Sequence, residues 1–248
     1  MDIHKPKPWH GVREFLKEYL IIVIGVLTAL GAEAVVERLH ESRLSDEAKA
    51  AVRAEINVNL TNLARRAGPN GTESCIARRL EELEALLDRA DATGVWTPPA
   101  NVDTLGRLEI QTQRWDAAMA AGRASLLSSD EQRAFGRVYV DFARAAEVQR
   151  QQSDVWIRLR GLAALRRLSP EMSDAARTEI SQARDLDVAF QAAFANANVY
   201  AAQLAVKGDA TLFRFPDEAL RAARAHAICE PLRTLPPPNL KGQTHGHS

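Results

Sequence analysis

The stretch from Tyr19 to Val36, YLIIVIGVLTALGAEAVV, decides how this chain is organised. It holds one charged residue, Glu33. At about 1.5 Å per residue a helix of this length reaches roughly 27 Å, close to the thickness of a bilayer core of about 30 Å. The segment is apolar on every face, which is typical of a helix surrounded by lipid. It therefore predicts a transmembrane helix over residues 19–36.

Two other interpretations of this segment stay open. Ala32-Glu33-Ala34 has the small-residue pattern of a secretory cleavage site, and shorter apolar runs occur as buried helices of soluble proteins. Against cleavage, the preceding region is long and carries Glu14 and Glu18. Against a soluble core, aromatic residues precede the run, where membrane-interface anchors lie. We therefore expect an uncleaved signal-anchor.

The basic residues around the segment predict its orientation. Four of them precede it, and one, Arg38, falls within the first ten residues from Glu33. Cytoplasmic flanks of membrane helices carry the excess of Lys and Arg, so we expect a bacterial inner-membrane protein with most of its chain in the periplasm. The predicted parts are a cytoplasmic N-terminus (1–18), a transmembrane helix (19–36), a periplasmic helical bundle (37–230) and a disordered proline-rich tail (231–248).

The rest of the chain has the 3.6-residue period of helices, and no stretch shows the alternation of a strand. Ser128 followed by Glu131 has the pattern of a capping box, and Ser169-Pro170 suits the start of the next helix. The expected helices continue the membrane segment to residue 66 and then cover 72–92, 102–124, 128 to about 168, 170–208 and 216–229. Long helices with apolar seams predict an all-α fold, in which the N-terminal transmembrane helix is followed by an antiparallel up-and-down bundle with coiled-coil-like packing.

Two cysteines, Cys75 and Cys229, follow the membrane segment. In an oxidising periplasm such a pair is expected to form a disulfide. It would close a loop of roughly 150 residues, which the chain-entropy account values at up to about 5 kcal/mol. Two unrelated buried thiols are the alternative. His226 has metal-ligand spacing to Cys229 but no second pair accompanies them, so we predict no metal site.

Gly25, Ala29 and Glu33 follow one another at intervals of four residues and therefore share one face of the membrane helix. Small residues at this spacing let two helices approach closely. This face is the candidate helix-packing surface, for a homodimer or for another membrane protein of the envelope. The alternative is a lone anchor in the lipid bilayer, with Glu33 reaching the outer headgroups.

Some aromatic and polar residues of the expected bundle have two interpretations each. Three tryptophans either line a ligand pocket or, as large aromatics at helical spacing commonly do, fill the core: Trp96, Trp115 and Trp156. Three polar residues near the seams either line a cavity or specify the register of the helices: Thr112, Gln149 and Gln152.

Composition and motifs limit the function. Lys+Arg and Asp+Glu each number 32, so the net charge is zero and a nucleic-acid-binding surface is not expected. The sequence has no P-loop, G-x-S-x-G, H-E-x-x-H or paired C-x-x-C motif, so we predict neither catalytic residues nor a cofactor. The leading hypothesis is an interaction or scaffold module of the envelope. A ligand sensor that signals through a partner is the alternative, and an enzyme is the least favoured.

Residues 13–41, which begin REFLKEY, resemble the start of a group of bacterial proteins. Those proteins share a single N-terminal membrane helix and an alanine-rich helical exported domain. Residues 75–80 (CIARRL) and 115–122 (WDAAMAAG) resemble them more loosely. The resemblance implies an uncleaved anchor in a bacterial inner membrane and brings no known activity with it.

Overall fold

The computed structural model describes residues 11–67, 73–103, 105–106, 108–208 and 227–236. Within these ranges the protein is all-helical, as predicted, and has no strand beyond an isolated bridge between Pro99 and Thr234. The α-helices are α1 (Val12–Ala67), α2 (Glu73–Thr93), α3 (Gln113–Ala120), α4 (Ser129–Arg160) and α5 (Pro170–Gln203). The 3₁₀-helices are η1 (Arg123–Leu126), η2 (Gly161–Ala164) and η3 (Ala227–Cys229).

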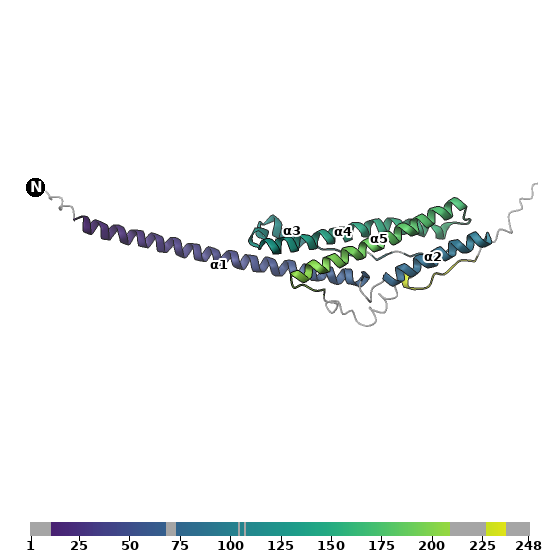
Figure 1. The fold of residues 1–248 in the computed structure, drawn as a ribbon, viewed down its shortest axis with the longest axis horizontal. Helices are drawn as coiled ribbons and strands as arrows, with labels where there is room; N and C mark the ends of the chain where they lie inside the picture. Colours follow the sequence, from purple (N-terminus) through teal and green to yellow (C-terminus); the bar gives the residue numbers. More distant parts are fainter. Residues whose placement is uncertain (1–10, 68–72, 104, 107, 209–226, 237–248) are drawn as a thin grey trace, which may run out of the picture.

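Helix α1 has two parts with different surroundings. It is 56 residues long, so at about 1.5 Å per residue it reaches roughly 84 Å. Its apolar N-terminal part projects from the rest of the molecule (Figure 1), and the apolar window of this part is 0% buried. The first buried residue is Ser45. By length and composition, α1 is the one helix of the described chain that is suited to span a membrane.

The described chain from Ser45 onward, which we call the helical body, is built on a hairpin of α4 and α5. These two helices lie side by side and antiparallel (Figure 1). The second half of α1 packs against one end of the hairpin and α2 packs against the other end. Two separate chain segments therefore follow one another along the same side of the hairpin.

The interior of the helical body consists of two apolar clusters. The α1 cluster joins α1 and α3 to the first half of α4 and the second half of α5, and its centre includes Ile56 and Phe142. The α2 cluster joins α2 to the other halves of α4 and α5, and its centre includes Leu83 and Trp156. Leu186 of α5 packs against both clusters. The α4–α5 hairpin is thus the element that connects them.

The starts of α4 and α5 are as predicted. The hydroxyl of Ser128 accepts a hydrogen bond from the backbone N–H of Glu131, and the Glu131 carboxylate accepts one from the N–H of Ser128 at 3.0 Å. The capping box is therefore confirmed. At α5, the hydroxyl of Ser169 accepts from the N–H of Met172, and Pro170 occupies the first turn. Such caps satisfy N–H groups that have no partner inside their own helix.

The predicted helix over 102–124 is wrong for its first half. The described residues of 102–112 are not helical; α3 begins only at Gln113, and η1 follows it. The described residues of 102–112, which we call the strap, lie in the chain between α2 and α3. The helix predicted to end near residue 168 stops at Arg160, and η2 follows.

Side chains from neighbouring helices explain why the strap is not helical. The side-chain amide of Asn59 in α1 forms two hydrogen bonds with the backbone of Gln111, and that of Gln149 in α4 forms two with the backbone of Leu108. Backbone groups that are bonded in this way have no need of the hydrogen bonds of a helix. Tertiary partners therefore override the helical period of this segment.

The C-terminal segment 227–236 lies along α2 (Figure 1). Ala100 donates its backbone N–H to the carbonyl of Arg233 at 2.7 Å, and Leu232 packs against the α2 cluster. The described start of the predicted tail 231–248 is thus attached to the helical body. The rest of that tail, and most of the helix predicted over 216–229, lie outside the described residues.

Candidate functional site

The candidate packing face of the apolar segment is open in the structure. Gly25, Ala29 and Glu33 are all exposed, and a Cβ atom added at Gly25 would meet no atom within 4 Å. Near the start of the segment, the rings of Phe15 and Tyr19 stack with their centres 6.3 Å apart. The face is free to contact lipid or a second helix, and which of them covers it stays a prediction.

A short polar stretch joins the apolar segment to the helical body without a break in α1. Residues 37–44 (ERLHESRL) are exposed except for the half-buried Leu44. The hydroxyl of the next residue, Ser45, donates to the carbonyl of Leu126 at the end of η1, at 3.4 Å. Because α1 is continuous, the direction of its apolar segment determines how the helical body is oriented relative to that segment.

Glu55 of α1 holds the start of α3. Its side chain is buried and accepts hydrogen bonds from the backbone N–H groups of Arg114 at 2.8 Å and Trp115 at 3.3 Å. These belong to the first turn of α3, where Thr112 makes no side-chain cap of its own. A negative charge is also favourable at this end of the helix dipole. The carboxylate of one helix therefore caps another.

Tyr139 of α4 completes this arrangement by donating its hydroxyl hydrogen to Glu55 at 2.5 Å. The Tyr139 ring stacks on the ring of Trp115 with 5.1 Å between centres, and it meets Phe142 edge-on at 5.6 Å. Burial and the neighbouring Glu55 carboxylate raise the pKa of the Tyr139 hydroxyl. The hydroxyl therefore stays a neutral donor, and the group links α1, α3 and α4.

The same face of α1 holds the strap. Glu55, Asn59 and Asn62 are separated by four and three residues and so lie on one side of the helix. Asn59 donates to the carbonyl of Gln111 at 2.7 Å and accepts from its N–H at 2.8 Å. Asn62 donates to the carbonyl of Glu109 at 3.2 Å. This polar face, which we call the anchoring face, fixes the position of α1 against the strap and α3.

A buried polar group lies near the end of α1, next to the ring of Phe190. The guanidinium of Arg66 is 3.4 Å from the carboxylate of Asp187 in α5 and 4.2 Å from the centre of the Phe190 ring. The amide of Gln152 in α4 lies 3.5 Å from the same carboxylate. Burial lowers the pKa of Arg66 and raises that of Asp187, while the attraction within the pair opposes both shifts. Such a pair is costly to break on one side because a buried charge is left alone.

Arg79 of α2 is fully buried and attaches two chain segments to this helix. It pairs with Glu82 at 3.1 Å and with Asp103 of the strap at 3.0 Å. It also donates to the carbonyls of Asn101 at 2.6 Å and Ile228 at 3.4 Å. One arginine thus holds the start of the strap and the C-terminal segment together.

The predicted cysteine pair comes together at the same place. The sulfur atoms of Cys75 and Cys229 are 2.09 Å apart, which is disulfide distance, and their Cα atoms are 4.8 Å apart. Arg78 donates to the carbonyl of Cys229. The C-terminal segment is therefore attached to α2 by the pair of Cys75 and Cys229 and by hydrogen bonds from Arg78 and Arg79.

The three tryptophans have core positions. Trp156 and Trp96 are buried in the α2 cluster, and the indole N–H of Trp96 donates to the carbonyl of Leu165 at 2.9 Å. Trp115 is partly buried against the α1 cluster. Thr112, the third of the polar residues near the seams, donates to Asp116 at 2.8 Å. The core interpretation of these tryptophans accounts for their contacts.

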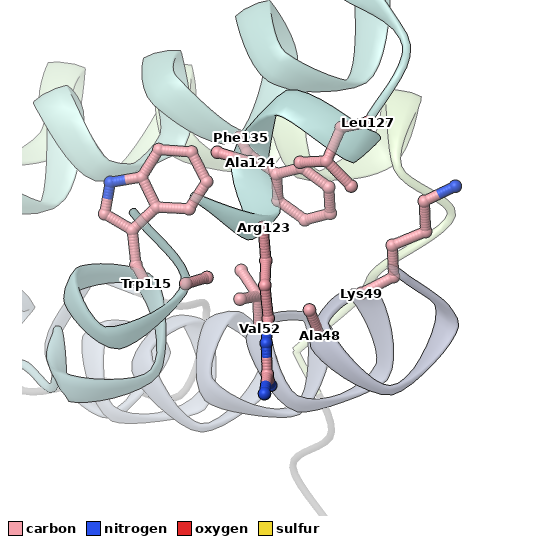
Figure 2. Close-up of a pocket in the computed structure, with 9 residues that line it drawn as sticks. Ala48, Lys49, Val52, Trp115, Arg123, Ala124, Leu127 and Phe135 are labelled. Carbon is pink, nitrogen blue, oxygen red and sulfur yellow. The ribbon is translucent and has the colours of Figure 1, made fainter. Parts of the chain in front are cut away.

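A small hollow lies between α1, α3, η1 and the start of α4 (Figure 2). It is lined by Ala48, Lys49, Val52, Trp115, Ala118, Arg123, Ala124, Leu127 and Phe135. Its volume of about 10 Å³ holds about one water molecule. The ammonium of Lys49 pairs with Glu131 at 3.1 Å. The hollow is too small for a metabolite.

Glu55, Asn59 and Arg79 were not among the predicted site residues. Their sequence signal is a polar residue beside or within an apolar stripe, as Asn59 lies between Ile56 and Leu63. Across the ranges that the structure describes, no group of three or more His, Cys, Asp or Glu side chains could hold a metal ion. No family model, no curated protein and no solved structure matches the chain.

Proposed function

We propose that this is a single-pass protein of the bacterial inner membrane. Its N-terminus lies in the cytoplasm, and its helical body forms a periplasmic antiparallel up-and-down bundle that serves as an interaction or scaffold module. The observation that carries the proposal is the contrast within α1. Its second half lies in the core, whereas Ile21, Leu27 and Val36 in the first half are 62–69% exposed. Apolar surface in water costs about 25 cal/mol per Å², and a bilayer removes this cost.

The helical body has features that suit an interaction module. The anchoring face of α1 holds the helical body to the helix that carries the apolar segment, through the hydrogen bonds of Glu55 and Asn59. The hollow of Figure 2 has room for about one water molecule, which does not favour a ligand sensor at that place. On its outer surface, α5 presents exposed apolar residues at spacings of four and three: Val188, Ala192, Ala195, Val199 and Ala202. This stripe has the spacing of a helix-packing seam.

The topology is tested with reporter fusions after Val36 and after Ser248. A periplasm-only reporter is expected to be active at both places, and the full-length chain should stay in the membrane pellet after alkaline extraction. Activity of a cytoplasm-only reporter at either place would refute the proposed topology. Recovery of the intact chain in the soluble fraction without detergent would refute the anchor.

The scaffold role is tested by photo-crosslinking in cells from Val188 and Val199, with Ser181 as the matched control. Ser181 lies one heptad before Val188, on the same face of α5, and is also exposed. We expect adducts of defined mass from the two valine positions and none from the serine. Adducts of equal yield from all three positions, or from none, would contradict a specific interaction through this stripe.

A further inference from the structure

One end of the helical body faces the membrane segment. Helix α3 starts beside Glu55, whose carboxylate binds the N–H of Arg114, and it runs back toward the N-terminal part of α1. Figure 1 shows α3 at the end of the body from which the apolar part of α1 projects. Residues 117–126, the last turn of α3 together with η1, which we call the apolar tip, form this end next to Ser45.

The composition of the apolar tip is unusual for a solvent-exposed turn. Its sequence, AAMAAGRASL, contains no acidic residue and a single basic one, Arg123. Met119 is 52% exposed and Leu126 is 36% exposed. Residues 120–122 are exposed as well. Met119 and Leu126 therefore present apolar side chains at the end of the body that faces the membrane segment.

The distance to the proposed membrane is short. The carbonyl of Leu126 lies 3.4 Å from the hydroxyl of Ser45, which is nine residues after Val36. Nine helical residues span roughly 13 Å. The headgroup layer accounts for about 5–7 Å of this distance, and membrane helices tilt by about 20° on average. About 6–8 Å then remains to the outer edge of the headgroups, and a tilt toward the α3 side shortens this distance.

We propose that the apolar tip docks on the outer surface of the same membrane. Met119 and Leu126 insert among the lipid headgroups. Arg123, whose half-buried side chain lies across α1 beside Val52 (Figure 2), turns outward to meet their phosphates. This inference rests on the proposed membrane anchor. Apolar side chains accompanied by a cation are the chemistry that binds an anionic lipid surface. No ion pair of Arg123 is found within the described ranges, and its charge complements that of phosphate.

The test uses the full-length chain reconstituted in vesicles of phosphatidylethanolamine and phosphatidylglycerol. An environment-sensitive fluorophore is attached at Met119→Cys, and in separate samples at Leu27→Cys within the apolar segment and at Met172→Cys. Met172 is 47% exposed and lies in the first turn of α5, at the opposite end of the hairpin. The native cysteines are paired and do not react. We expect blue-shifted emission and quenching by lipid-borne nitroxide at positions 27 and 119, with neither at 172.

The outcomes separate the two proposals. If position 27 gives the blue shift and the quenching but position 119 gives neither, as expected for position 172, tip docking is overturned and the anchor stands. Absence of a signal at position 27 would overturn the anchor and tip docking with it. Leu126→Asp, followed through the probe at position 119, is expected to lower the docked fraction about tenfold. Arg123→Gln should weaken docking on anionic vesicles and have little effect on purely zwitterionic ones. An unchanged docked fraction in both variants would also overturn the proposal.

Discussion

The hydroxyl of Tyr139 in α4 donates a 2.5 Å hydrogen bond to the carboxylate of Glu55 in α1. That carboxylate also caps α3 through the N–H groups of Arg114 and Trp115. One side chain on the helix that carries the apolar segment therefore connects three helices. A movement of α1 away from α4 breaks the hydrogen bond between Glu55 and Tyr139.

Glu55→Ala is expected to lower the free energy of unfolding by about 3 kcal/mol. The substitution leaves three buried or partly buried donors without an acceptor, and such donors cost about 1–3 kcal/mol each when unpaired. Urea unfolding of the detergent-solubilised chain measures the change. Glu47→Ala, at an exposed position of the same helix, is the matched control and should change stability by less than about 0.5 kcal/mol. Equal effects of the two substitutions would contradict the role of Glu55.

Tyr139→Phe is expected to change how stability depends on alkaline pH. The pKa of Tyr139 is raised in the folded protein, chiefly by burial and then by Glu55, so the folded state keeps the proton that the unfolded state loses near pH 10. The stability that this group contributes is complete below pH 10 and falls above it. The variant should be less stable than the parent at pH 8, and the difference should narrow between about pH 10 and 11. A constant difference across this range would contradict the shift.

Asn59→Ala is expected to release the strap. Both backbone groups of Gln111 lose their partner, which corresponds to about 2–4 kcal/mol. Amide hydrogen exchange at residues 108–111 should become faster. Asn62→Ala removes one 3.2 Å hydrogen bond near the surface and should cost less than about 1 kcal/mol. Unchanged exchange at these amides in Asn59→Ala would show that other contacts hold the strap.

Replacing both Cys75 and Cys229 by serine is expected to destabilise the helical body without unfolding it. The pair spans 154 residues, and the chain-entropy account gives an upper value of about 5 kcal/mol. Arg79 still binds the C-terminal segment through the carbonyl of Ile228, so helix content should be retained. Thermal unfolding with and without reductant measures the effect. Reductant should lower the Tm of the parent to that of the double variant and leave the variant unchanged; any other result would argue against the bridge.

Ala29→Cys is expected to form an intermolecular disulfide in the membrane if the face with Gly25 and Glu33 packs against a second copy. Leu27→Cys is the control, because a shift of two residues along a helix turns the side chain to nearly the opposite side. Leu27 is 62% exposed, and Ala29 is exposed as well. Oxidative crosslinking on non-reducing gels distinguishes the two. Similar yields from both positions would indicate random collision rather than a dimer face.

Features that depend on neighbours in the sequence were predictable. Within the described residues, the apolar run identifies the one helix that is suited to span a membrane. The Ser128 and Ser169 caps start α4 and α5, and the helical period locates the end of α1 and both ends of α2 to within one residue. Caps and amphipathic stripes act over a few residues, so a local pattern contains the information. The pairing of Cys75 with Cys229 was also predicted, because the chain has two cysteines and only one pairing within it is possible.

Two features were decided by the tertiary structure. One is the non-helical strap, and the other is that α1 and α2 pack against opposite ends of the α4–α5 hairpin. Residues 102–112 have a helical period, yet the amides of Asn59 and Gln149, distant in sequence, bind their backbone. The burial of Arg79 likewise depends on carbonyls from residues 101 and 228. The sequence by itself determined the helices and the apolar segment, since these need only local hydrogen bonds and periodic side chains. Only the packed chain decided where buried polar groups find their partners, because the partners named here lie 22 to 149 residues away.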